Sequence, residues 1–154
     1  MPDPHRSLPP QVGHGDAWEM VTTTFACDQC GANASTLALL PPFGLLPWAQ
    51  PPDLPDENVL FADSLRFSID GPVNVTHLFP PEREVDLAAL DAALRAGDAR
   101  ALYRINPEFA PAWCWSCSKS YCRACWVMWV DYDDGFYDCT RGRCPEGHER
   151  VIDD

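Results

Sequence analysis

Apolar and polar side chains alternate in the middle of the chain and predict a pair of β-strands. The alternation runs from Leu65 to Ile69, pauses at the turn-forming pair Asp70-Gly71, and resumes from residue 73 to residue 77. We therefore expect a β-hairpin with one buried face. His77 falls in the alternating set of the second strand, and we interpret it as a packing residue rather than a ligand.

The pattern then changes to a helical period. Leu87, Leu90 and Leu94 recur at a spacing that places them on one face of a helix. Gly97 is suited to end this helix. Asp98 can cap a second, short helix over residues 99–104, which must end before the next proline.

Two further stretches favour β-structure. Residues 21–26 are β-prone and lead into the first cysteine pair, and residues 126–132 form a strongly apolar run. Asp133-Asp134-Gly135 is a hairpin turn signal, so a return strand should begin at Phe136. Residues 41–56 are rich in proline, and we expect an irregular, packed loop there.

Composition narrows the functional classes. The 154 residues carry a net charge of −12, which argues against a nucleic-acid binder and against docking on anionic lipid. No apolar run approaches the length of a membrane span, and the N-terminal residues lack an apolar signal core. We expect a cytoplasmic protein with no nucleic-acid or membrane partner, whose 16 prolines forbid a mostly helical fold.

Cysteine spacing provides the clearest chemical signal. Three pairs have the C-x-x-C spacing that lets a tight turn direct two sulfurs at one ion, and C-P-E-G-H pairs a cysteine with a histidine. Four pairs fill two tetrahedral sites, so we predict two structural Zn²⁺ ions. Their predicted ligands are Cys27, Cys30, Cys114, Cys117, Cys122, Cys125, Cys144 and His148.

Other uses of the cysteines are less favoured. Cysteine density is low for a small disulfide scaffold, and no secretion signal is visible. A thioredoxin-type redox pair needs a single C-x-x-C, and an iron–sulfur cluster does not explain the histidine. Cys139 is left over, and we expect a free thiol, with replacement of Cys144 or His148 as a ligand the alternative.

Two pairings of the ligand pairs remain open. An extended stretch from Cys117 to Cys122 would hold their sulfurs roughly 15 Å apart, so the two should serve different ions. In a sequential scheme the first pair joins the second, and the third joins the fourth. In an interleaved scheme the first joins the third, and the second joins the fourth.

The run from Cys114 to Trp126 resembles the centre of cross-brace, treble-clef type zinc modules of the FYVE, RING and PHD families. It has a C-x-x-C pair, four residues ending in an aromatic, and a second C-x-x-C pair. The resemblance implies two zinc ions held by interleaved ligand pairs. It covers residues 114–148 and adds the first cysteine pair as a distant partner.

These observations predict an α+β fold in which a small zinc-stabilised hairpin and knuckle core carries an inserted segment of hairpin and helices. We expect a flexible tail over residues 1–20 and one two-zinc domain over residues 21–154. Within that domain, residues 31–113 form the insertion and residues 114–148 form the zinc-knuckle core.

No catalytic motif accompanies the predicted metal sites, so we expect a protein that is not an enzyme. The first hypothesis is a protein-interaction module, an adaptor or an immunity-like inhibitor, whose acidic surface engages a basic partner. One alternative is a RING-like adaptor for ubiquitin-type conjugation with an apolar groove built from Trp115, Trp126 and Pro145. Another is a zinc-thiolate redox sensor. The sequence sets no oligomeric state.

Overall fold

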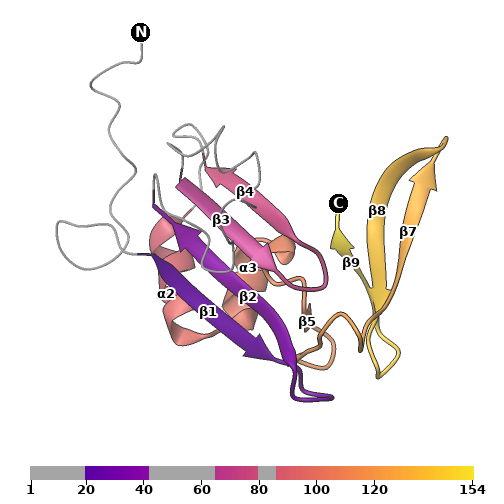
Figure 1. Ribbon diagram of the computed structural model, residues 1–154, viewed down its shortest axis with the longest axis horizontal. Coiled ribbons are helices and arrows are strands. Elements are labelled where there is room, and N and C mark those ends of the chain that lie inside the picture. The colour runs from indigo at the N-terminus through magenta and orange to yellow at the C-terminus, as the bar shows by residue number, and fades with distance from the viewer. Residues whose placement is uncertain (1–19, 42–64, 80–85) are drawn as a thin grey trace, which may run out of the picture.

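The computed structural model describes residues 20–41, 65–79 and 86–154. The predicted tail, apart from its last residue, lies outside these ranges, as does the proline-rich segment apart from its first residue. The described residues form three antiparallel sheets, two α-helices and one short 3₁₀-helix (Figure 1).

The first sheet has four strands in the order β1-β2-β3-β4, each antiparallel to its neighbour. Leu39 of β2 lies opposite Val21 on one side and Phe67 on the other, so these three apolar residues share one face. The strand bounds are β1 Val21–Ala26, β2 Asn33–Leu40, β3 Leu65–Asp70 and β4 Val75–Phe79.

The predicted hairpin in this region is confirmed as β3 and β4. The expectation of one buried face is wrong for β3, in which five consecutive residues are buried, Arg66 and Ser68 among them. An interior strand that is covered on both faces loses the exposed polar side that alternation suggested. His77 of β4 stacks on Phe67 and meets Phe109 edge to face, which agrees with a packing role.

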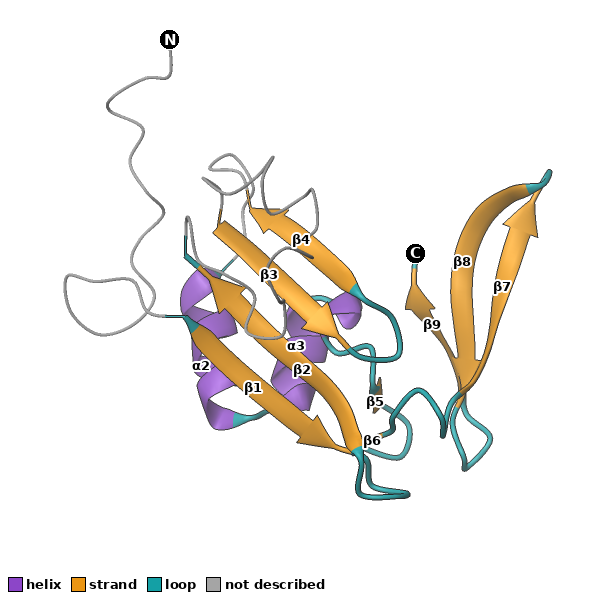
Figure 2. Cartoon of the chain, in the orientation of Figure 1, coloured by secondary structure: helices purple, strands orange, loops and turns teal. Residues whose placement is uncertain are grey.

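Both predicted helices are present and lie on one face of the first sheet (Figure 2). They are α2 (Leu87–Ala96) and α3 (Ala99–Ile105), followed by η1 (Pro107–Phe109). The side chain of Asp86 accepts a hydrogen bond from the Ala89 backbone N–H at the start of α2. Gly97 ends α2 with a φ of 61°, a conformation that glycine adopts without steric cost.

The helices and the first sheet enclose the larger of two cores. Fifteen buried residues make up this core: Val21, Leu37, Leu39, Leu65, Phe67, Ile69, Phe79, Leu87, Leu90, Ala93, Leu94, Leu102, Phe109, Ala110 and Trp113. The leucines of α2 contribute the face that their spacing predicted.

The remaining strands form two smaller sheets. The short strands β5 (Trp113–Cys114) and β6 (Lys119–Ser120) pair with each other, and β7 (Val127–Asp133), β8 (Phe136–Arg143) and β9 (Glu149–Asp153) form a three-stranded sheet. The predicted return strand is therefore confirmed. The β7–β8 hairpin extends away from the first sheet, and β9 lies beside its base (Figure 1).

The predicted α+β fold class is wrong, because the described structure is mostly β, with three antiparallel sheets and only two short helices. Four strands, β2, β5, β6 and β9, were not predicted from the sequence, and β5 and β6 have only two residues each. Most of β2 is buried, and its second half, Leu37 to Leu40, is a continuous apolar run that does not alternate, whereas β9 is only five residues long. The larger core also lies outside the predicted zinc-knuckle segment, because all of its residues precede Cys114. No helix in the described ranges is long and apolar enough to cross a membrane.

Candidate metal centres

The eight predicted ligands assemble into two groups of four. Within each group, one ligand atom from every residue lies within 4.8 Å of the others. The first group, here called site 1, contains Cys27, Cys30, Cys122 and Cys125. The second, called site 2, contains Cys114, Cys117, Cys144 and His148.

This grouping has the interleaved arrangement. The first C-x-x-C pair joins the third, and the second joins the Cys/His pair. The sequential scheme is not the one that the fold adopts. The interleaving is compatible with the cross-brace resemblance, and both groups could hold a metal ion.

A tight turn after β1 presents the first pair of site 1. The Cys27 carbonyl accepts a hydrogen bond from the Gly31 N–H at 2.9 Å, and the Cys27 N–H donates to the Ala32 carbonyl at 2.7 Å. Gly31 has a φ of 77°, which explains why a glycine directly follows Cys30. The other pair uses a similar turn, in which the Cys125 N–H donates to the Cys122 carbonyl at 2.9 Å.

Site 2 is built from the same kind of turn. The Gly147 N–H donates to the Cys144 carbonyl, and the Cys144 N–H donates to the His148 carbonyl, both at 2.9 Å. Gly147 has a φ of 91°, and Ser118, which directly follows Cys117, has a φ of 55°. The backbone turns therefore bring each ligand pair together through contacts that are local in sequence.

The ligand atoms are close but not bonded to one another. In site 1 the Cys122 sulfur lies 3.6 Å from the sulfurs of both Cys30 and Cys125. In site 2 the His148 Nδ1 atom lies 3.7 Å from the Cys114 sulfur and 3.5 Å from the Cys144 sulfur. All eight cysteines are free thiols, and these separations are far longer than a disulfide bond of about 2.05 Å.

The thiols of site 1 differ in how readily they ionise. Burial opposes ionisation of Cys27, but backbone N–H groups of Cys122, Cys30 and Gln29 outweigh it and lower the pKa of Cys27 to about 6. Burial raises the pKa of Cys125 to about 12, and the neighbouring Cys122 and Cys27 side chains add to the effect.

Site 2 shows the same division. Burial opposes ionisation of Cys144, yet the backbone N–H groups of His148 and Glu146 lower its pKa. Burial raises the pKa of Cys117 to about 12, and the side chain of Glu146 raises it further. Each site therefore favours one thiolate and resists a second. A bound cation would remove this conflict, because it favours the deprotonated form of every thiol that it contacts.

A tyrosine supports site 2 from behind. The Tyr121 side chain is 2 % exposed, and its hydroxyl lies 3.3 Å from the Cys117 sulfur and 3.5 Å from a carboxylate oxygen of Glu146. Tyr121 directly precedes Cys122, so one residue lies next to a ligand of site 1 and contacts a ligand of site 2. The aromatic ending the four-residue spacer signalled this residue in the sequence, but not its contact with a ligand.

The turn that holds the first cysteine pair is attached to the second sheet by two hydrogen bonds. The Asp28 N–H donates to the Ser120 carbonyl, and the Asp28 carboxylate accepts from the Ser120 N–H, each at 2.8 Å. This contact crosses 92 residues of sequence. It brings the turn after β1 close to Cys122 and so fixes the interleaved pairing.

Site 1 is the more accessible of the two groups. Cys30 is exposed and Cys125 is half-buried, whereas site 2 contains no fully exposed ligand. Cys139 belongs to neither group. It is buried in β8, with its sulfur 3.9 Å from a carboxylate oxygen of Asp131, which agrees with the expectation of a spare thiol.

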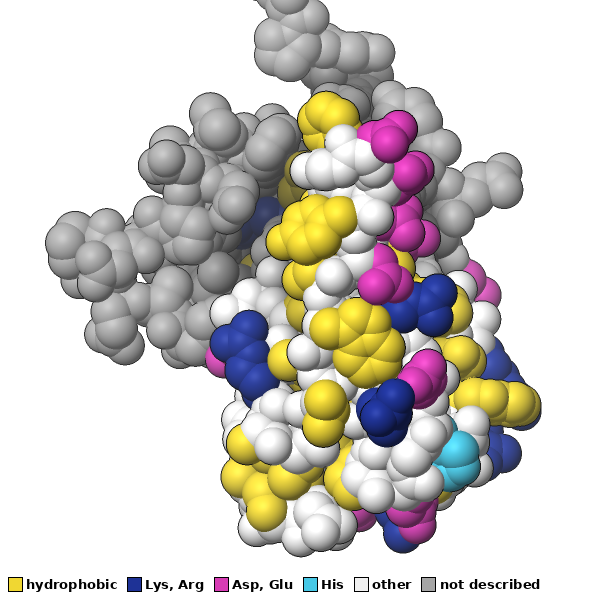
Figure 3. All heavy atoms as spheres, turned by 90° about the vertical axis from the view of Figure 1, so that its right-hand side faces the viewer, with side chains coloured by type: hydrophobic (Ala, Val, Ile, Leu, Met, Phe, Trp, Pro, Cys, Tyr) yellow, Lys and Arg dark blue, Asp and Glu magenta, His cyan; other side chains and the backbone are white. Residues whose placement is uncertain are grey.

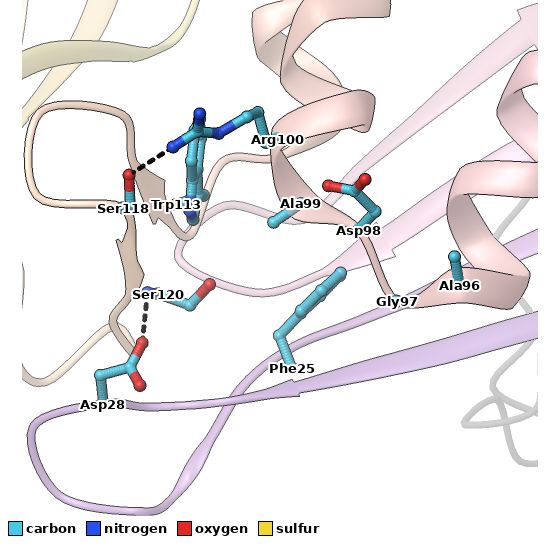
Figure 4. A pocket seen from close by; sticks show the side chains of 10 residues that line it. All are labelled: Phe25, Asp28, Ala96, Gly97, Asp98, Ala99, Arg100, Trp113, Ser118 and Ser120. Atoms are coloured by element: carbon cyan, nitrogen blue, oxygen red, sulfur yellow. Dashed lines mark hydrogen bonds between the residues drawn. The ribbon is translucent and has the colours of Figure 1, made fainter.

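An open depression of about 480 Å³ lies where the first sheet, α3 and β6 meet (Figure 4). Four of the polar side chains that line it already have hydrogen-bond partners. Arg100 donates to the Ser118 hydroxyl at 2.9 Å, the Asp98 carboxylate caps α3, and Asp28 accepts from Ser120. We therefore interpret the depression as a junction between the first sheet with its helices and the short β5–β6 sheet, rather than as a ligand site.

Exposed apolar side chains collect on the third sheet. The large apolar side chains that are exposed number eight in the described ranges, and six of them belong to this sheet. In a view of this side of the molecule, apolar and acidic side chains lie along one projecting edge (Figure 3). The six residues are Val127, Val130, Tyr132, Phe136, Tyr137 and Val151.

The model of a protein family described as "Domain of unknown function (DUF8328)" matches residues 19–154. The chain belongs to this family. The match spans both metal-ligand groups and all three sheets, so the features described above are contained in the family domain. No curated protein and no solved structure matches the chain.

Proposed function

We propose that the protein is a two-zinc protein-interaction module in which both metal sites are structural. The spacing of the ligand atoms carries this proposal. A tetrahedral zinc ion with Zn–S bonds of about 2.3 Å separates its sulfur ligands by about 3.8 Å, and a sulfur from an imidazole nitrogen by about 3.6 Å. In site 1 the Cys122 sulfur lies 3.6 Å from the sulfurs of Cys30 and Cys125, and in site 2 the Cys117 sulfur lies 4.0 Å from that of Cys144, while the nitrogen–sulfur separations are 3.5 and 3.7 Å.

The ligand sets favour zinc in a structural role. Four thiolates, or three thiolates and an imidazole, are typical of structural zinc, whereas catalytic zinc keeps one position for water. A multi-iron cluster would hold its cysteine sulfurs further apart than a single ion does. Zinc at site 1 would be held by Cys27, Cys30, Cys122 and Cys125, and zinc at site 2 by Cys114, Cys117, Cys144 and His148.

The position of the sites suggests what they support. Cys125 lies two residues before β7, Cys144 directly follows β8, and His148 directly precedes β9. Metal bound at both sites would therefore fix the base of the third sheet. Since a two-stranded hairpin is only marginally stable alone, this anchoring would keep the exposed apolar side chains of β7 and β8 in a defined arrangement.

Metal analysis of single-site variants tests the zinc assignment. The unaltered chain, purified without added metal, should contain two zinc ions. Cys122→Ser should leave one at site 2, and Cys144→Ser should leave one at site 1. Cys139→Ser is the matched control and should retain two, because Cys139 lies outside both groups. A chain without zinc, or a Cys139→Ser variant that loses zinc, would contradict the proposal.

The RING-like alternative receives less support. Its apolar groove would need the side chains of Trp115, Trp126 and Pro145 on one surface. Trp115 is 65 % exposed, but Trp126 is 4 % exposed and packs in the smaller of the two cores with Tyr121 and Cys122, where its indole N–H donates to the Ala112 carbonyl. A conjugating enzyme could therefore not contact the buried Trp126 side chain.

Exposure of Cys30 favours redox sensing as a second candidate function. Hydrogen peroxide would take two electrons from two site 1 thiolates, which would form a disulfide as the peroxide and two protons became two waters. The zinc ion would then leave. Peroxide titration should release about one zinc per chain before the second, and Cys30→Ser should remove that first phase. Zinc retained at millimolar peroxide would exclude this function.

A further inference from the structure

From the third sheet we infer an interaction surface for an arginine-rich, extended polypeptide segment, which pairs with the outer edge of β7 and lies across the tip of the β7–β8 hairpin. This inference rests on the proposed function, because it requires the metal sites to hold the base of the hairpin. It adds to that function the docking surface and the chemistry of the partner.

The composition of the tip supplies the first argument. Residues 132–138, which form the tip, contain three aspartates and three aromatic residues, and no lysine or arginine. Tyr132 is 68 % exposed and Phe136 is 77 % exposed. Carboxylates concentrated beside exposed aromatic rings attract cations, so the tip is complementary to a basic partner and repels an acidic one.

The base of the same hairpin shows which cation suits this chemistry. There the Arg143 guanidinium lies over the Trp129 ring at 5.8 Å from the ring centroid, and the Arg141 guanidinium contacts the Asp131 carboxylate at 2.8 Å. Each arginine thus covers an aromatic ring or pairs with a carboxylate of the opposite strand.

At the tip, the corresponding groups are not covered by the protein's own cations. Between described residues, no ion pair involves Asp133, Asp134 or Asp138. A guanidinium group can stack on an aromatic ring and bind a carboxylate through two N–H groups, whereas an ammonium group offers no planar face. The tip therefore favours arginine over lysine.

The outer edge of β7 supplies the second argument. In the third sheet the strand order is β7-β8-β9, and no other strand in the described ranges pairs with the outer edge of β7. Such an edge presents backbone N–H and C=O groups that an extended segment can bind as an added strand. The side chains of β7 contain neither lysine nor proline. Its charged residues are Asp131 and Asp133, which would disfavour pairing with an acidic segment and attract a basic one, and its pairing with β8 is irregular only between Asp131 and Tyr132.

The turn at the tip keeps the edge and the aromatic rings in one arrangement. Asp134 and Gly135 both have positive φ values, 46° and 82°, as in the tight hairpin turns that match strand twist. Tyr132 lies opposite Tyr137, and Asp133 lies opposite Phe136. Tyr132 and Asp133 are thus neighbours on the edge strand β7, and Tyr137 and Phe136 lie opposite them on β8.

The experiment selects peptides from a random twelve-residue display library on the zinc-loaded full chain at low salt. We expect the selected peptides to carry arginine more often than lysine, at alternating positions, with no proline in their centres. The tightest peptide should lose at least about tenfold in affinity for Asp133→Lys and for Tyr132→Thr. Asp70→Lys places the same charge change at the end of β3 and should alter its affinity less than about twofold.

Amide hydrogen exchange locates the bound peptide. The β7 amides should exchange more slowly when the peptide is present, and those of β1 should not change. Selected peptides without basic residues, or equal weakening by Asp70→Lys, would overturn the inference. So would protection of β7 that grows with protein concentration in the absence of peptide, since a second copy would then occupy the edge.

Zinc content, measured on the same sample, separates the two proposals. If the chain contains no zinc, the proposed function fails. If it contains two zinc ions and protected β8 and β9 amides, yet selects no peptide, the docking surface fails and the zinc assignment stands.

Discussion

The two halves of the molecule are stabilised by different means. The first sheet and the α-helices share a core of fifteen buried residues, and fourteen of these are aliphatic or aromatic residues between Val21 and Ala110. The second core has nine buried residues, and four of them are cysteines that belong to the two candidate metal sites. We therefore expect the second half to depend on metal bound at these sites, where the first depends on apolar packing.

This difference shows how the short C-terminal segment could keep its three long strands folded without a large apolar core. Residues 112–153 are too few to bury much apolar surface, and small segments of this kind commonly use metal or disulfides instead. The division is not complete, because the β1–β2 turn carries Cys27 and Cys30 into site 1. Metal at site 1 would thus join the halves as well as stabilise the second.

Removal of both metal ions should break the comparison most strongly. In EDTA we expect the β7, β8 and β9 amides to lose their protection against hydrogen exchange, while the first sheet stays protected. The physical reason is that structural zinc sites contribute on the order of 10 kcal/mol to folding. Amide exchange with and without zinc measures the effect, and added zinc should restore protection. Persistent protection of the third sheet in EDTA would show that its own packing suffices.

Leu90→Ala should produce the opposite pattern. Leu90 is fully buried in the first core, and its truncation should lower the free energy of unfolding by about 2–5 kcal/mol. Denaturant unfolding in the presence of zinc measures this loss, and zinc content should remain at two ions per chain. Arg95→Ala, on the exposed side of the same helix, is the control and should cost only about 0.5 kcal/mol. A Leu90→Ala variant that also lost zinc would show that the halves are not separable.

Arg150→Lys tests the link between the halves. The Arg150 guanidinium donates hydrogen bonds to the carbonyls of Ala110, Trp113 and Pro107 at 2.6–3.0 Å, and it lies over the Tyr103 ring. Lysine keeps the charge but cannot supply the same planar set of donors, so we expect a loss of about 2 kcal/mol.

Thermal unfolding in zinc, followed separately by signals from β3 and from β8, measures this loss. The two transitions should separate in Arg150→Lys. The control, Arg143→Lys, changes an exposed arginine on the same sheet and should leave them together. Coincident transitions in Arg150→Lys would place the coupling elsewhere, for example at site 1.

The metal ligands could be predicted from the sequence because their geometry is local. Two residues between cysteines, or three between Cys144 and His148, are enough for a turn that presents both ligands. The order in which the pairs combine is not local. It depends on the contact between Asp28 and Ser120, which are 92 residues apart, and no spacing rule reports it.

The fold class was predicted wrongly for a related reason. The alternation that identified β3 and the period that identified α2 are properties of half-buried elements. By contrast, β2 is buried along most of its length and β9 is short, so neither leaves a clear pattern. Arg150 has no sequence signature either, since its carbonyl partners lie about 40 residues away and come from the 3₁₀-helix, the residue after it and the start of β5.

Tyr121→Phe should have the smallest effect. It extends the comparison from the two halves to the two metal sites, because it should change zinc dissociation at site 2 and not at site 1. The Tyr121 hydroxyl lies 3.3 Å from the Cys117 sulfur, a ligand of site 2, and can donate a hydrogen bond to the thiolate. Groups that bind metal ligands from behind commonly change metal affinity by about tenfold, so zinc at site 2 should dissociate about tenfold faster. Zinc at site 1 should dissociate at its original rate, since the phenylalanine ring still fills the buried position beside Trp126.

Zinc transfer to a competing chelator measures both rates. In Tyr121→Phe the transfer should show two clearly separated phases, whereas the exposed Tyr132→Phe control should leave the time course unchanged. Equal acceleration of both zinc ions would mean that Tyr121 stabilises the whole second core through packing and that its hydroxyl has no particular role at site 2.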